Sequence, residues 1–254
     1  MVRNKVVKVI VLSITLLVVE ISFLKAQDAR EIVKKAYDLM QGQSSYSEMT
    51  MTIHRPKWDR TIGFKSWMKG NDYALIYITE PAKEKGQVFL KRKTEMWNWV
   101  PSVDRMIKLP PSMMMQSWMG SDITNDDLVN ESSIVDDYKQ TLIGNESFEG
   151  SACYKIELIP DENAPVVWGK IISWISINDY ITFKNEYYNE DGELVNIETM
   201  SRIQDFGNRR IPGYFEIRPV DKEDQSTVME IKDIRFNEKI EDGFFSIQNM
   251  KSVR

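Results

Sequence analysis

The sequence contains one cysteine and one histidine among 254 residues. A single cysteine, Cys153, cannot form an internal disulfide, so packing has to stabilise the fold. Cys153 lies in an alternating run of apolar and polar residues, which predicts an ordinary strand position. The single histidine, His54, has no cysteine or acidic neighbour at metal-ligand spacing in Ile53-His54-Arg55-Pro56. The sequence therefore predicts no metal site.

Sequence motifs for catalysis are missing as well. The chain has no Gly-x-Ser-x-Gly turn, no phosphate-binding glycine loop and no dinucleotide fingerprint. The acid pairs Asp126-Asp127 and Asp136-Asp137 would point to opposite faces of a strand, so helix caps explain them better. A general base needs an orienting partner, and the sequence offers His54 none nearby. We therefore expect no catalytic residue, no cofactor and no enzymatic activity.

The first 26 residues have the composition of a secretory signal peptide. Three basic residues precede an apolar run at residues 9–19, and cleavage is expected after the small residue Ala26. Glu20 ends the apolar run well short of the roughly 20 residues that a spanning helix needs, which disfavours an uncleaved anchor. The cleavage point carries no cysteine for a lipid anchor. We expect a soluble mature protein in the periplasm.

Residues 27–254 are long enough for one domain with its own core, and no linker or repeat divides them. Cleavage removes four basic residues and one acidic residue, so the formal charge moves from −5 to −8. An acidic surface argues against nucleic acid as a partner and against electrostatic docking on anionic lipid.

Two periodicities organise this mature chain. Between Asp28 and Met40, apolar residues recur every three or four positions, which predicts one helix. Short alternating runs separated by turns then predict strands at residues 48–53, 62–69, 73–79, 87–91, 95–100, 105–109, 138–143, 152–159, 170–177, 182–188, 194–205, 214–218 and 227–236. We therefore predict a mainly β fold, with one antiparallel sheet that curls into a barrel or half-barrel.

An apolar insert interrupts the strands between residues 109 and 128. Ser112 can cap a short helix there, and Thr124 can start a second capped turn. The first helix would carry Met113, Met114, Met115, Trp118 and Met119. Three consecutive methionines cannot share one direction, and methionine suits surfaces that accept variable apolar ligands. A ligand cavity and an ordinary core remain equally good explanations for this cluster.

If a cavity exists, the insert is expected to form its lid over the concave face. The predicted lid residues are Met113, Met114, Trp118 and Met119. Alternation places a weaker set on the cavity wall: Ile62, Phe64, Met68, Ile76, Trp97 and Trp99. A register error of one residue would turn each wall residue outward.

Several motifs occur in a fixed order along the mature chain. They are Thr79-Glu80-Pro81-Ala82, Glu95-Met96-Trp97, Leu109-Pro110-Pro111-Ser112-Met113-Met114, Gln116-Ser117-Trp118-Met119-Gly120-Ser121-Asp122 and Pro165-Val166-Val167-Trp168-Gly169-Lys170. With them the chain resembles the LolA-like outer-membrane lipoprotein-sorting family, in the branch that includes an uncharacterised treponemal protein. The resemblance implies an unclosed β-barrel covered by helices, with an apolar cavity for lipoprotein acyl chains. It also implies an inner-membrane transporter as donor and an outer-membrane acceptor.

Three functional hypotheses follow. The leading one is a periplasmic carrier that shields the acyl chains of lipoproteins, or of another envelope lipid, for transfer toward the outer membrane. The alternative is a non-catalytic accessory or binding module of an envelope transporter, with the insert as a docking patch. The third is a hydrolase of envelope lipids, which requires a buried carboxylate or serine beside His54.

Overall fold

The computed structural model describes residues 29–254, apart from positions 94, 131–133, 163 and 165. The predicted signal peptide, residues 1–26, lies outside the described residues. Among the helices that are described, none combines the length and the hydropathy required to cross a bilayer.

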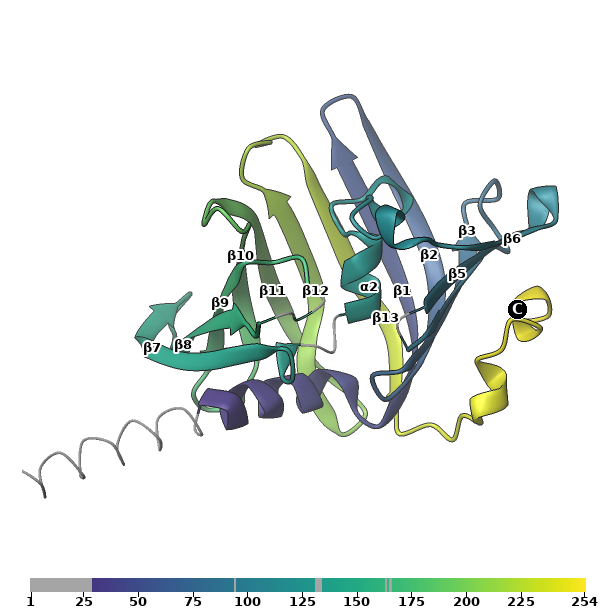
Figure 1. The fold of residues 1–254 in the computed structure, drawn as a ribbon. Helices are drawn as coiled ribbons and strands as arrows, with labels where there is room; N and C mark the ends of the chain where they lie inside the picture. Colours follow the sequence, from purple (N-terminus) through teal and green to yellow (C-terminus); the bar gives the residue numbers. More distant parts are fainter. Residues whose placement is uncertain (1–28, 94, 131–133, 163, 165) are drawn as a thin grey trace, which may run out of the picture.

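One antiparallel sheet of thirteen strands makes up most of the structure (Figure 1). The strands are β1 (Ser44–Arg55), β2 (Trp58–Lys69), β3 (Tyr73–Glu80), β4 (Val88–Arg92), β5 (Glu95–Val100), β6 (Arg105–Lys108), β7 (Tyr138–Phe148), β8 (Ser151–Pro160), β9 (Lys170–Ser176), β10 (Thr182–Tyr188), β11 (Leu194–Phe206), β12 (Arg209–Pro219) and β13 (Ser226–Phe236). Their order across the sheet is β6-β5-β4-β3-β2-β1-β13-β12-β11-β10-β9-β8-β7. Consecutive strands are thus neighbours, except that β6 and β7 form opposite edges.

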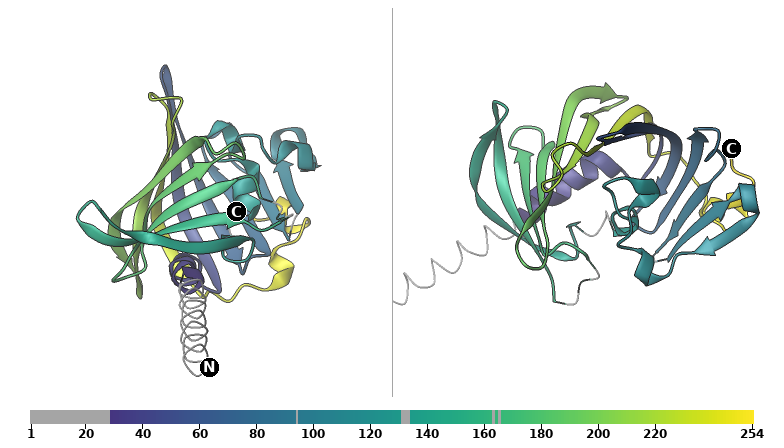
Figure 2. Two further views of the ribbon diagram at one scale, coloured as in Figure 1. Left: turned by 60° about the vertical axis from the view of Figure 1, so that its left-hand side comes forward. Right: turned by 90° about the horizontal axis from the view of Figure 1, so that it is seen from above.

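The sheet curls into an arc that stays open. Viewed from above, the strands follow a curved wall with the N-terminal helix beneath it (Figure 2). Within the described residues, each edge strand is paired on one side only. The predicted mainly β, unclosed barrel is therefore confirmed. Because β6 and β7 are joined by residues 109–137, this connection has to cross the open side of the barrel.

The helical elements are few and short apart from the N-terminal helix. That helix covers residues 29–41 and packs Ile32, Val33 and Ala36 against β7, β8 and β9. The others are η1 (Pro101–Val103), η2 (Pro111–Met113), η3 (Trp118–Gly120), α2 (Asn125–Asn130), η5 (Asp242–Phe244) and η6 (Asn249–Lys251). In Figure 1, α2 lies in front of β1 and β13, on the concave side of the sheet.

Apolar side chains bury both faces of the first half of the sheet. On the concave face, Met51, Ile53, Ile62 and Phe64 pack beneath the insert. On the convex face, Leu75, Tyr77 and Leu90 pack against the C-terminal segment after β13, which contributes Phe245, Met250 and Val253. The alternation of side chains along each strand separates the two layers.

Four strands, β1, β2, β7 and β12, are at least four residues longer than the sequence predicts. Strand β12 begins at Arg209 and not at Tyr214, because Pro212 and Gly213 are strand residues here. A Cβ at Gly213 would lie 2.1 Å from Nε2 of Gln204 on β11, so the side-chain amide of Gln204 occupies the space above this glycine. Strand β7 continues past Gly144, where the register with β8 shifts at a bulge.

The insert differs from its prediction. The expected helix from Ser112 through Met119 is wrong, because η2 and η3 are separate single turns. Around η3 the chain folds back on itself: Trp118 N–H donates to the carbonyl oxygen of Ile123 at 2.7 Å, and Ser117 bridges to Thr124. The expected second capped turn is present as α2, with Thr124 before its first residue.

Candidate functional site

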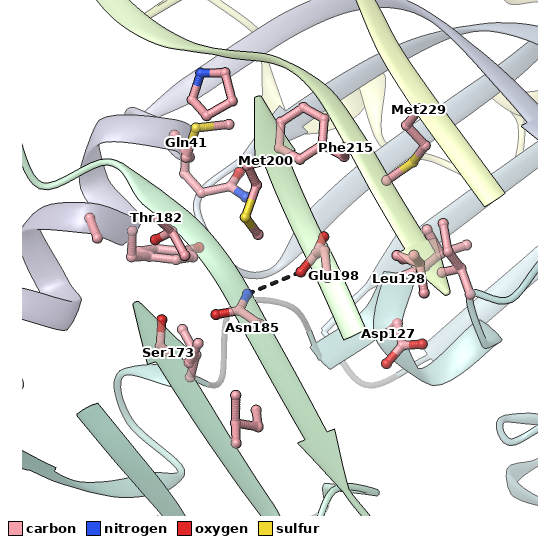
Figure 3. Close-up of a pocket in the computed structure, with 18 of the residues that line it drawn as sticks. Gln41, Asp127, Leu128, Ser173, Thr182, Asn185, Glu198, Met200, Phe215 and Met229 are labelled. Atoms are coloured by element: carbon pink, nitrogen blue, oxygen red, sulfur yellow. Dashed lines mark hydrogen bonds between the residues drawn. The ribbon is translucent and has the colours of Figure 1, made fainter. Parts of the chain in front are cut away.

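A cavity of about 360 Å³ opens on the concave face of the sheet (Figure 3). Its volume lies in the range of roughly 300–1,000 Å³ that is typical of ligand pockets. It is enclosed by the N-terminal helix, the sheet, the insert and the segment before β9, which contributes Val166, Val167 and Trp168. Its apolar lining includes Val33, Ala36, Met40, Met49, Phe64, Met68, Ile76, Trp118, Ile123, Leu128, Met200, Phe215, Ile217, Met229 and Ile231.

A group of polar side chains interrupts this apolar lining on β10 and β11. Glu198 Oε2 accepts a hydrogen bond from the hydroxyl of Tyr187 at 2.7 Å and another from Nδ2 of Asn185 at 3.0 Å. Asn185 Nδ2 also lies 3.3 Å from the Tyr187 hydroxyl. Residues 185, 187 and 198 all face the cavity, because they alternate along paired strands.

A second carboxylate reaches the cavity from α2. Asp127 Oδ2 accepts hydrogen bonds from the backbone N–H and the hydroxyl of Thr124, both at 2.8 Å, and the Asp127 N–H donates back to that hydroxyl at 3.1 Å. This reciprocal pattern is a capping box at the start of a helix. Asp127 Oδ1 accepts from Trp168 Nε1 at 3.2 Å.

Burial controls the ionisation of both carboxyl groups. Loss of hydration raises the pKa of Glu198, against the hydrogen bonds from Tyr187 and Asn185 that lower it, and the Asp127 charge adds to the increase. Burial also raises the pKa of Asp127, against the hydrogen bonds from Thr124 and Trp168 that lower it. The pKa of Tyr187 is raised well above its ordinary value, chiefly by burial and then by the Glu198 charge. The hydroxyl of Tyr187 therefore stays protonated and donates to Glu198.

Two buried polar atoms at the cavity have no hydrogen-bond partner among the described residues. One is Oδ1 of Asn185, whose residue is 6% exposed. The other is Nε1 of Trp118, whose residue is 1% exposed. Buried polar groups are normally paired, so each such atom in a cavity wall is available to a ligand.

Hydrogen bonds and an ion pair hold the insert against the end of β1 and the beginnings of β2 and β13. The Arg55 guanidinium donates to both oxygens of Asp122 at 3.0 Å, and Thr227 Oγ1 donates to Asp122 Oδ2 at 2.7 Å. Arg55 also donates to the carbonyl oxygen of Gly120 at 3.0 Å. Arg60 donates to the carbonyl oxygen of Met119 at 3.1 Å. The insert is thus held by arginines from two adjacent strands.

A family model described as "-like: Uncharacterized protein" matches residues 70–252. The chain belongs to this family. The comparison with curated proteins finds no match.

Comparison with solved structures shows that this protein has a LolA-like fold. A DUF1329 family protein from Desulfovibrio piger has a TM-score of 0.81 and 22% identity, over 89% of this chain and 99% of its own. A putative outer membrane lipoprotein-sorting protein domain from Vibrio parahaemolyticus has a TM-score of 0.78 and 20% identity, over 89% and 99%. A LolA superfamily protein from Nitrosomonas europaea has a TM-score of 0.75 and 22% identity, over 87% and 98%.

The structure places half of the predicted wall residues at the cavity. Phe64, Met68 and Ile76 line it. Ile62 is fully buried beside them in the concave core cluster and is not part of the lining. Trp97 and Trp99 lie on the convex face, in the cluster that includes the C-terminal segment. On β5 it is Met96 that points to the concave side.

Among the predicted lid residues, Trp118 alone lines the cavity. It packs edge-on against Phe64 and Phe89, with ring centroids 5.8 and 5.5 Å apart. Met114 and Met119 pack on the outside of the same core cluster. Met113 is half-buried, and its carbonyl oxygen accepts from Asn125 Nδ2 at 3.0 Å.

The sequence-based prediction missed the polar group and the contribution of the N-terminal helix. Asn185 and Tyr187 alternate in a recognisable strand, which was the available signal for inward polar residues. Their pairing with Glu198 depends on the register of β10 and β11, which the sequence does not show. The insert also supplies Ile123, which was not among the predicted lid residues.

His54 lies at the exposed tip of the β1–β2 hairpin. Its Nδ1 is 3.0 Å from Oδ1 of Asp59, and the two side chains are 42% and 65% exposed. The hydrolase hypothesis required a buried carboxylate or serine beside His54. The buried Ser226 lies opposite His54 on β13, but the imidazole pairs with the exposed Asp59 instead.

Proposed function

We propose that the protein is a periplasmic carrier that shields an acyl chain of a lipoprotein, or of another envelope lipid, for transfer toward the outer membrane. The observation that carries this proposal is the cavity of about 360 Å³ with its predominantly apolar lining. Each methylene moved out of water contributes roughly 0.8 kcal/mol, so a long acyl chain gains on the order of 10 kcal/mol by entering such a space.

The composition of the wall supports a variable apolar ligand. Five methionines line the cavity, namely Met40, Met49, Met68, Met200 and Met229. Unbranched, polarisable side chains adapt to ligands of different shape. The Vibrio parahaemolyticus protein with the same fold is described as a putative lipoprotein-sorting domain, which agrees with an acyl-chain cargo.

The compartment and the partners belong to the proposal as well. The signal-peptide pattern of residues 1–26 supports export to the periplasm. There the carrier would accept its cargo from an inner-membrane transporter and deliver it to an outer-membrane acceptor. No step in this scheme requires catalysis or a cofactor.

Native mass spectrometry of the freshly purified mature protein tests the proposal. We expect lipid to be retained by the wild type and by Thr50→Phe, and lost in Ser47→Phe. Ser47 lines the cavity, so a phenyl ring there fills it, whereas Thr50 points to the other face of β1. Wild-type protein that holds no lipid and does not bind an apolar dye, but co-purifies with a transporter, would favour the accessory-module alternative.

A further inference from the structure

At the polar end of the cavity, the donors of Asn185 and Tyr187 are used by Glu198, and one buried acceptor is left unpaired. Nδ2 of Asn185 donates hydrogen bonds to Glu198 Oε2 and to the Tyr187 hydroxyl. This arrangement fixes the amide with Oδ1 turned away from Glu198 (Figure 3). Oδ1 is buried in the cavity wall and has no partner among the described residues. An acceptor that is held in place and left unpaired calls for a donor from a ligand.

The two carboxyl groups at this end accept hydrogen bonds from neutral groups, namely Thr124 and Trp168 for Asp127 and Asn185 and Tyr187 for Glu198. Glu198 and Asp127 both line the cavity, and Figure 3 shows Glu198 between Asn185 and Asp127. The described groups that shift the pKa of these two carboxyls include hydrogen-bond donors and acids but no lysine or arginine. In contrast, Asp122 in the same wall has Arg55 as its partner. A cation in the cavity would therefore meet two carboxyl groups whose own hydrogen bonds come from neutral donors.

We propose that this end of the cavity binds the primary ammonium head group of an aminolipid. The inference rests on the proposed carrier function and adds the class of head group. An ammonium group has three N–H donors and no acceptor, so it can donate to Asn185 Oδ1 and to the Glu198 carboxylate together. It also supplies the opposite charge that favours the ionised carboxyls. The acyl chain would then lie against Met200, Phe215 and Met229.

Anionic heads fit this end poorly for the same reasons. A carboxylate or phosphate would place acceptors against Asn185 Oδ1 and like charge against Glu198 and Asp127. A hydroxyl head can donate one hydrogen bond but brings no charge. The site therefore ranks head groups in the order ammonium, hydroxyl, carboxylate.

Three amphiphiles with the same twelve-carbon chain test this ranking. Dodecylammonium, dodecanol and dodecanoate would each displace an apolar fluorescent dye from the wild-type mature protein at neutral pH, below their micellar concentrations. We expect dodecylammonium to bind at least tenfold more tightly than dodecanoate. Glu198→Gln should reduce that preference to under threefold and leave dodecanol affinity within twofold of wild type.

A matched control separates the site from general attraction to an acidic protein. Glu216→Gln removes the same charge from the convex face of β12, where Glu216 pairs with Arg218. It should leave the ammonium preference unchanged.

Equal binding of dodecylammonium and dodecanoate by the wild type overturns the head-group inference while the carrier function stands. A preference that survives Glu198→Gln overturns it too. If none of the three amphiphiles binds, the carrier function falls together with it.

Discussion

The guanidinium of Arg55 and the carboxylate of Asp122 form a bidentate ion pair, in which both nitrogen–oxygen distances are 3.0 Å. The two side chains are 13% and 8% exposed. Arg55 ends β1 and Asp122 belongs to the insert, so this pair joins the wall of the barrel to the segment that crosses its open side.

Removal of Asp122 should therefore destabilise the protein strongly. Asp122→Ala leaves the Arg55 charge buried without its counter-ion, and we expect the free energy of unfolding to fall by about 3 kcal/mol. Equilibrium urea denaturation measures this change. As a control, Glu146→Ala breaks an exposed pair with Lys155 and should cost less than about 1 kcal/mol. Equal effects of the two substitutions would contradict the role of the buried pair.

The part of the insert that lines the cavity should control ligand affinity. Leu128→Asp puts a charge into the apolar wall, so we expect the affinity for an apolar dye to fall at least tenfold. Met115 lies in the same insert but is 60% exposed, so the substitution Met115→Asp should leave the dye affinity unchanged. Fluorescence titration of the two variants checks both expectations. Similar losses in both would show that the insert acts through its general charge.

Trp118 illustrates why a lid residue can be a poor choice for a binding test. It is fully buried between Phe64 and Phe89, and Trp118→Ala should cost about 3–5 kcal/mol of stability through the space it leaves. Thermal unfolding of the variant, followed by circular dichroism, measures the loss. A change below about 1 kcal/mol would mean that the aromatic contacts contribute little.

The stability of the protein should depend on pH through Glu198. Burial raises the folded-state pKa of Glu198 above its unfolded value, so the folded form binds more protons in the window between the two values. The contribution of Glu198 to stability is thus fully present below the unfolded pKa and is lost as pH rises through the folded pKa. Glu198→Gln cannot ionise, so its stability relative to wild type should increase from pH 4 to pH 8. Urea unfolding at both pH values tests this, and a difference that does not change with pH would contradict it.

The C-terminal segment should matter for stability and not for binding. Phe245 is 1% exposed and packs with Leu75 and Leu90 on the convex face, so Phe245→Ala should cost about 3–5 kcal/mol. Ile247 in the same segment is 36% exposed, and Ile247→Ala should cost less than about 1 kcal/mol. Both variants should keep wild-type dye affinity when assayed well below their melting temperatures.

Periodicity predicted the fold well because each strand buries alternate residues. Strands β5 and β10 have the predicted bounds, and the N-terminal helix ends at Gln41, one residue beyond its predicted end. The errors occur where local signals conflict with tertiary contacts. Pro212 and Gly213 look like the end of a strand, yet Pro212 pairs with Ile203 on β11 and Gly213 lies inside β12.

The cavity was harder to predict because the alternation does not say which face is concave. Trp97 and Trp99 alternate correctly, but a second apolar layer covers the convex face of their strand. The C-terminal segment that forms this layer has no strand or helix periodicity in its sequence, so its packing on the sheet could not be predicted. Likewise, the polar end of the cavity depends on Glu198 meeting Asn185 across two strands, and that contact exists only once the register is known.

The gap between the edge strands β6 and β7 affects how the width of the cavity is determined. In a closed barrel, a continuous ring of backbone hydrogen bonds fixes the circumference. Here, in the part of the chain that the structure describes, the edge strands β6 and β7 are not paired with each other. The insert and the N-terminal helix pack against the sheet through their side chains. The circumference of the interior is therefore not set by backbone hydrogen bonds between β6 and β7, and the side chains of these two segments determine how wide the binding space is.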